Sequence, residues 1–147
     1  MNFRNPARAG ALILGAVLIA SIATIGAADS KHGPIPWLTS LSKAKNVAAK
    51  QKKPMLVDFY ADWCPPCKEM AKSTWKDKQV VARAKKFVPV LVDIDKYPNQ
   101  ADSAKVSAVP TVVFDDSKGR ELLRADGYRD AKAMLDLMAQ AEKKTKR

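Results

Sequence analysis

Two cysteines, Cys64 and Cys67, are the residues whose type and spacing bear most directly on chemistry. They are the only cysteines in the sequence, and Pro65 and Pro66 separate them. A Cys-x-x-Cys pair can contribute to a zinc site, attach haem covalently, form a small structural disulfide or act as a redox dithiol. These alternatives make different demands on the rest of the chain.

Three of the four alternatives fit this chain poorly. A zinc site needs four ligands, and beyond the cysteines the chain has a single histidine, His32. Haem attachment needs a histidine directly after the second cysteine, where this chain has Lys68. A disulfide between such close residues closes a loop too small to stabilise a fold much. The pair therefore favours a redox dithiol, with no metal and no cofactor.

The flanking residues would place the pair at the start of a helix. Residues 55–60 form an apolar run that predicts a buried strand, and residues 64–74 are predicted to be helical. Prolines are tolerated in a first helical turn, whose N–H groups have no partner within the helix. Because the positive end of a helix lowers the pKa of a thiol, we expect Cys64 to be exposed and nucleophilic. Cys67 would then resolve the mixed disulfide.

The rest of the chain alternates strands with helices. Predicted helices span residues 39–51, 77–84, 98–105 and the stretch after Asp130; further strands span residues 88–94, 111–114 and 121–124. This order is typical of an α/β domain with a central mixed sheet. We expect a parallel core, an antiparallel C-terminal hairpin and helices on both faces.

The first 28 residues differ in kind from the rest. Arg4 and Arg8 precede a segment, residues 9–28, that carries no charge and ends in the small residues that signal peptidases need. We expect residues 1–28 to be an export signal cleaved after Ala28. The alternative is an uncleaved anchor that tethers the protein through residues 9–28, because such a segment is just long enough to cross a bilayer.

The remaining chain is expected to form a linker and one domain. Residues 29–36 are polar and contain Gly33, Pro34 and Pro36, which predicts a linker before a domain at residues 37–147. Export would place that domain in the periplasm, where disulfide chemistry is permitted. The net charge of +11 comes mainly from dispersed lysines, which favours a solvated basic surface or attraction to acidic partners or membranes. The sequence has no basic stripe interleaved with aromatic residues, so it does not indicate nucleic-acid binding.

Two stretches carry a family resemblance. Phe59-Tyr-Ala-Asp-Trp-Cys-Pro-Pro-Cys-Lys68 resembles the active-site motif of the thioredoxin superfamily, and Val109-Pro110-Thr111 resembles its loop with a cis-proline. The resemblance covers residues 37–142 and implies a thioredoxin fold. Within the superfamily, the residues around the motif are most similar to the C-terminal domain of the periplasmic carrier DsbD.

The resemblance implies roles for further residues. Asp58 matches the family's buried acid, which would take the proton from Cys67. The positions implied for substrate binding are Trp63, packed against the dithiol, together with Pro65, Pro66, Val109 and Pro110. Gly127 matches a family glycine near the site.

Two departures from the family pattern bear on the chemistry. Leu91 stands where thioredoxin has a lysine near the buried acid, so the pKa of Asp58 is expected to be higher. Pro65 replaces a glycine and removes an N–H that could face a Cys64 thiolate, which favours a reducing protein.

We therefore expect a periplasmic thiol–disulfide oxidoreductase that reduces disulfides of exported proteins and works as a monomer. No flavin or nicotinamide motif is present, so electrons would come from a membrane thiol carrier. The alternatives are a dithiol oxidase that installs disulfides and a non-catalytic module that binds a partner.

Overall fold

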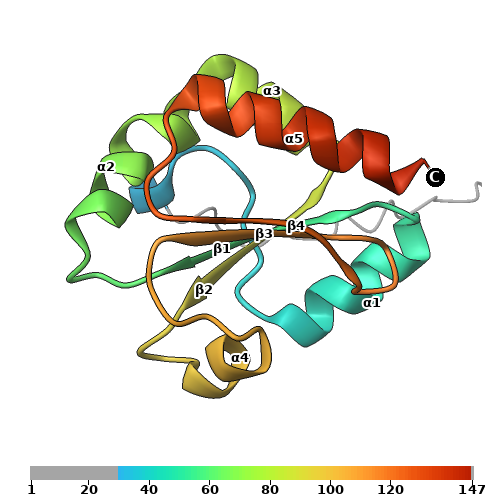
Figure 1. The fold of residues 1–147 in the computed structure, drawn as a ribbon, viewed down its shortest axis with the longest axis horizontal. Helices are drawn as coiled ribbons and strands as arrows, with labels where there is room; N and C mark the ends of the chain where they lie inside the picture. The colour runs from blue at the N-terminus through green and yellow to red at the C-terminus, as the bar shows by residue number, and fades with distance from the viewer. Residues whose placement is uncertain (1–29, 147) are drawn as a thin grey trace, which may run out of the picture.

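The computed structural model describes residues 30–146, which form one sheet with helices on both faces (Figure 1). The strands β1 (Met55–Tyr60), β2 (Val88–Asp93), β3 (Thr111–Asp115) and β4 (Glu121–Asp126) lie in the order β2-β1-β3-β4. β1 is parallel to β2 and antiparallel to β3, and β3 is antiparallel to β4. This arrangement confirms the predicted mixed sheet with its antiparallel C-terminal hairpin.

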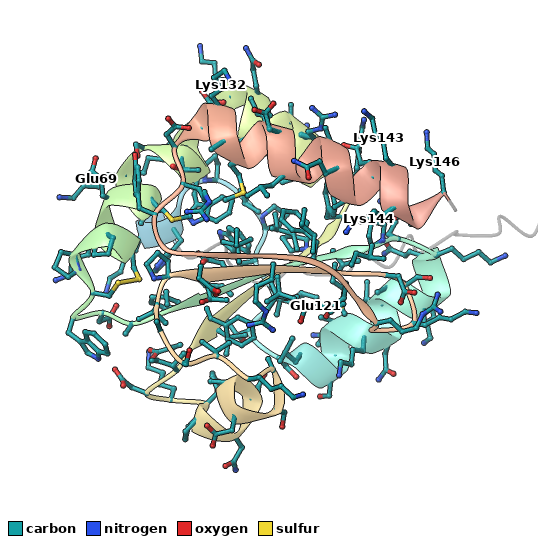
Figure 2. The ribbon with its side chains drawn as sticks, in the orientation of Figure 1. Glu69, Glu121, Lys132, Lys143, Lys144 and Lys146 are labelled. Carbon is teal, nitrogen blue, oxygen red and sulfur yellow. A yellow bond between two sulfur atoms is a disulfide. The ribbon has the colours of Figure 1, made fainter. Side chains whose placement is uncertain are left out.

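The helices form two layers. In Figure 1, α2 (Pro65–Lys72), α3 (Lys78–Ala84) and α5 (Ala131–Thr145) cover one face of the sheet, and α1 (Leu41–Gln51) and α4 (Pro98–Ser103) cover the other. Side-chain oxygens of Ser40, Asp77 and Asp130 accept first-turn N–H groups at the starts of α1, α3 and α5. Figure 2 shows Lys132, Lys143 and Lys146 pointing away from the sheet along α5.

β1 is buried along its whole length because helices cover both of its faces. Leu56 and Tyr60 pack into the core on the side of α2 and α5, whereas Val57 and Phe59 pack into the core on the side of α1. Successive side chains of a strand alternate between faces, so Asp58 points toward α2 and α5. β1 therefore places Asp58 in the core on the side of α2 and α5, and it ends a short turn before α2 begins.

The helix after β1 is shorter than predicted. α2 ends at Lys72, and a separate 3₁₀ turn, η2 (Thr74–Lys76), follows it. Ser73, at the junction, has φ −116° and ψ −72°, which departs from the φ of about −63° typical of an α-helix, and its hydroxyl donates a hydrogen bond to the carbonyl of Glu69. This break places the fully buried Trp75 in the core below β1.

Residues 30–36 are packed against the domain, which corrects the prediction of a linker. The segment begins with η1 (Ser30–His32), and Ile35 is fully buried. The next core residue, Trp37, stacks edge-on against Trp75 with ring centroids 5.1 Å apart, and its Nε1 donates to His32 O. Glycine and prolines suggested a linker, but the two large apolar side chains bury enough surface to hold the segment in place.

The predicted export signal at residues 1–28 lies outside the described residues. Within residues 30–146, no helix is long and apolar enough to cross a membrane.

Gly33 provides a test of how residues 30–36 pack against the domain. It has φ +79°, and a Cβ there would collide with the backbone carbonyl of Trp75. Gly119 has φ +80°, but a Cβ there would meet only the side chain of Lys45, at 3.5 Å. Gly119→Ala should lower the free energy of unfolding by about 1–2 kcal/mol through backbone strain alone. Gly33→Ala should cost at least about twice as much in urea unfolding, because a backbone group cannot move aside. Equal losses would show that residues 30–36 do not pack as described.

Candidate active site

Cys64 and Cys67 form a disulfide at the N-terminal end of α2, seen as the yellow bond between sulfurs in Figure 2. Their Cα atoms are 5.3 Å apart. Cys64 caps the helix, and its Sγ accepts a 3.3 Å hydrogen bond from the backbone N–H of Cys67. Pro65 and Pro66 fill the first two helical positions and have no N–H to donate. The sulfur of Cys64 therefore faces one first-turn donor, that of Cys67.

Cys64 is buried, contrary to the prediction that it would be exposed. Its residue is 2% exposed, and Cys67 is 4% exposed. The carbonyl oxygen of Val109, which lies 45 residues further along the chain, is 3.5 Å from Sγ of Cys64. A motif that marks the helix end carries no information about a distant loop that folds over it.

The loop over Cys64 contains a cis peptide bond between Val109 and Pro110. The carbonyl of Pro110 accepts a 2.7 Å hydrogen bond from the N–H of Gly127. Gly127 has φ +85°, a conformation that glycine adopts without steric cost. The hydrogen bond thus joins the start of β3 to the end of β4, next to the loop whose Val109 carbonyl reaches Cys64.

Asp58 lies on β1 between Leu91 of β2 and Val112 of β3, and it is 2% exposed. As predicted, Leu91 is its neighbour on the adjacent parallel strand and offers no positive charge. The Nε1 of Trp75 donates a 2.8 Å hydrogen bond to Oδ2 of Asp58. The other oxygen, Oδ1, has no hydrogen-bond partner among the described residues.

Burial dominates the ionisation of Asp58. It raises the pKa of the carboxyl from 3.8 to about 7, and the hydrogen bond from Trp75 opposes the rise. Ionising a buried carboxyl is costly without a positive partner, which explains the direction. A group with a pKa close to neutral pH is suited to accept and return a proton.

Sequence reasoning missed Trp75 as a site residue. It lies 17 positions after Asp58, outside the motif that contains the dithiol. A signal was present: a buried acid without a lysine needs some other donor, and an indole N–H is a donor only. Three tryptophans occur in the sequence, and the spacing alone does not show which of them reaches the acid.

Trp63, which the resemblance predicts to pack against the dithiol and bind substrate, is exposed at the surface. Trp63 directly precedes Cys64 in the sequence and is 62% exposed. Its indole Nε1 donates a 2.8 Å hydrogen bond to Oδ2 of Asp95. Asp95 follows β2, so this bond joins the turn before α2 to the loop after β2. The ring is held at the surface and its faces remain accessible.

A pocket of about 330 Å³ lies beside Cys67. Cys67 and His32 both contribute to its wall, although they are far apart in sequence. The ring of His32 packs against Tyr60 at a centroid distance of 4.3 Å, which fixes η1 beside the end of β1. The side chains of Lys68 and Lys72 from α2 complete one wall. No cluster of three or more potential metal ligands occurs among residues 30–146.

Comparison with known proteins agrees with this geometry. Residues 36–117 match the family described as thioredoxin-like. The thiol:disulfide interchange protein DsbD of Vibrio vulnificus is 37% identical over 126 residues, which is 74% of this chain and 21% of that protein. The DsbD of Actinobacillus pleuropneumoniae is 32% identical over 76% of this chain and 20% of its own length. The chain thus spans about a fifth of these curated relatives.

Solved structures show the same fold. A thioredoxin from Thermus thermophilus superposes with a TM-score of 0.66 at 25% identity, covering 73% of this chain and 87% of its own. The oxidised form of mitochondrial thioredoxin 3 from Saccharomyces cerevisiae gives a TM-score of 0.57 at 28% identity, covering 71% and 94%.

The raised pKa of Asp58 predicts how stability depends on pH. Between about pH 4 and pH 7 the unfolded carboxyl is ionised while the folded one keeps its proton, so this group stabilises the fold fully below that window and loses its contribution as the pH rises through it. Asp58→Asn removes the titration. In urea unfolding of the disulfide form, the stability of this variant relative to wild type should improve by about 4 kcal/mol between about pH 4 and pH 8. A constant difference across that range would contradict the raised pKa.

Proposed function

This chain belongs to the thioredoxin-like family, and on that premise we propose that it is a thiol–disulfide oxidoreductase that reduces disulfides of exported proteins through Cys64 and Cys67. The observation that carries the proposal is the position of the two cysteines at the start of α2, on the core face that also holds the buried Asp58. The same cysteines form the disulfide that such a reduction would leave behind.

In the first step, Cys64 is the nucleophile. Its thiolate attacks one sulfur of a partner disulfide, a new S–S bond joins the two proteins, and the partner's second sulfur leaves as a thiolate. The helix end and the N–H of Cys67 stabilise the attacking thiolate.

In the second step, Cys67 resolves the mixed disulfide. Its thiol passes a proton to Asp58, its sulfur attacks Sγ of Cys64, and the partner leaves with both sulfurs reduced. Two electrons have then moved from the dithiol to the partner. The buried acid suits this role because its pKa of about 7 lets it accept a proton near neutral pH.

The surface around the dithiol would bind the partner as an extended segment. Val109 and Pro110 present backbone beside the sulfur of Cys64, in the manner of an added strand. The exposed ring of Trp63 adds an apolar contact at the rim. The remaining contacts come from the start of α2, at Pro65 and Pro66.

The donors around Cys64 support the reducing direction over the oxidising one. Strong oxidants stabilise their thiolate form, and here two consecutive prolines leave the N–H of Cys67 as the first-turn donor to the sulfur. Reduction must be sustained by an electron donor, and the sequence has no flavin or nicotinamide motif. We therefore assign that role to a membrane thiol carrier, which would reduce the Cys64–Cys67 disulfide by the same exchange run in reverse.

The wild-type protein, reduced beforehand, should reduce insulin disulfides, and Cys64→Ser should abolish the reaction. Cys67→Ser should instead stop after the first step and retain its partners as mixed disulfides, which would identify them.

The reduction potential of the Cys64–Cys67 pair, measured against glutathione, should lie near the reducing end of the family range of about −270 to −120 mV. A value near −120 mV would favour the dithiol oxidase, and a wild type without turnover would favour the binding module.

Action on exported proteins requires export of this chain. The basic start, the uncharged segment at residues 9–28 and the small residues Gly26-Ala27-Ala28 support a signal that is cleaved before Asp29. The domain would then work in the periplasm, where partner disulfides exist.

The N-terminus of the protein recovered from cells should therefore begin at Asp29. Signal peptidase needs a small residue directly before the cleaved bond, so Ala28→Leu should block cleavage there, while Ala27→Leu, one position earlier, should leave it intact. Edman sequencing or mass spectrometry of the periplasmic and membrane fractions would measure this. An intact Met1 in the membrane fraction of the wild type would establish an anchor instead.

A further inference from the structure

We propose that Trp75 is a positioning residue of the redox site: its indole N–H holds Oδ2 of Asp58 and leaves Oδ1 as the oxygen that accepts the proton from Cys67. This inference rests on the proposed reductase function and deepens it. It assigns a task to a residue that does not touch the partner and acts only through the acid.

The hydrogen bond divides the carboxyl into two unlike oxygens. Oδ2 receives the N–H of Trp75 at 2.8 Å, whereas Oδ1 has no hydrogen-bond partner among the described residues, although it is buried. An unpartnered buried oxygen is costly, and it is retained most readily where it has a use. Proton transfer from a thiol on the same core face is such a use, directly or through a bridging water.

Among residues 30–146, the indole N–H of Trp75 is the one hydrogen-bond donor to the carboxyl of Asp58. Leu91 of β2 and Val112 of β3 flank it in the sheet, and α5 contributes the apolar Met134 and Met138 to the same core. This core also holds the two cysteines of α2, which titrate once reduced, and Tyr60, two positions along β1. His32 packs against Tyr60 from η1. Within the part of the chain that the structure describes, burial and the hydrogen bond from Trp75 are what shift the pKa of Asp58.

An indole does two things here that a lysine would do differently. It is a neutral donor, so it stabilises the ionised carboxyl by one hydrogen bond without supplying a full charge, and it cannot itself titrate. It is also a rigid ring: Trp75 is fully buried, contacts Trp37 and has the backbone of Gly33 against its own carbonyl. The carboxyl is thereby held by a side chain that is itself packed in the core.

The test removes the N–H while keeping an aromatic ring. Trp75→Phe should raise the pKa of Asp58, measured by ¹³C NMR titration of its carboxyl in the disulfide form, by about one unit above wild type. At pH 7 the ionised fraction would then fall about fivefold, and resolution of the mixed disulfide by Cys67 should slow by the same factor. The rate should recover toward wild type near pH 9, and the first attack by Cys64 should be unaffected.

The chain offers a matched control in Trp37→Phe. Trp37 belongs to the same core and contacts Trp75, but its N–H donates to the carbonyl of His32 and not to the acid. This variant should leave the pKa of Asp58 unchanged. If Trp75→Phe folds poorly, 3-benzothienylalanine at position 75 keeps the shape of the indole and lacks the N–H, and the same upward shift is expected.

Two outcomes would overturn the role of Trp75. One is a carboxyl pKa that does not move when the N–H is removed. The other is a resolution step that slows equally at every pH, as loss of packing alone would cause. The NMR titration needs no partner protein, so an unchanged pKa would leave the reductase proposal standing. Conversely, a wild type that fails to reduce insulin would overturn the reductase proposal whatever the titration shows.

Discussion

The structure depends on a single constraint, a carboxyl buried in the central strand of the sheet. Asp58 is flanked by apolar neighbours on both adjacent strands, and the one hydrogen bond that its carboxyl receives among the described residues comes from Trp75. An ionised acid in such a place is costly, so its pKa rises to about 7. The fold keeps it with one indole N–H and no counter-charge, which leaves the acid half-protonated near neutral pH.

The N-terminal segment of the domain is connected to that constraint. Trp75 holds the acid, Trp37 packs against Trp75, and Gly33 approaches the carbonyl of Trp75 so closely that no Cβ fits. Residues 30–37 therefore pack behind the acid that faces the redox site. They also bring His32 to the wall of the pocket that reaches Cys67. A segment that the sequence predicts to be a linker thus packs behind the residues that form the redox site.

The partner-facing side of the dithiol is built by segments from three parts of the chain. The start of α2 supplies the cysteines, the cis Val109–Pro110 loop covers Cys64, and the hydrogen bond from Gly127 ties that loop to the end of β4. Trp63 stands at the rim, fixed by Asp95. In the disulfide form both cysteines are buried, so under the proposed function a partner would meet the loop backbone and the exposed Trp63 before it meets Cys64.

The sequence by itself determined the local features. Apolar runs and capping residues predicted the strands and most helix starts, such as Ser40, Asp77 and Asp130, because periodicity and capping act within a few residues. The Cys-x-x-Cys pair, Asp58 and Val109–Pro110 were found from their motifs. Only the tertiary structure decided what covers Cys64, what holds Asp58 and whether residues 30–36 pack. Each of these is a contact between residues distant in sequence, such as the 45 positions from Cys64 to Val109. Such contacts follow from how layers pack, and no local pattern encodes which side chains then meet.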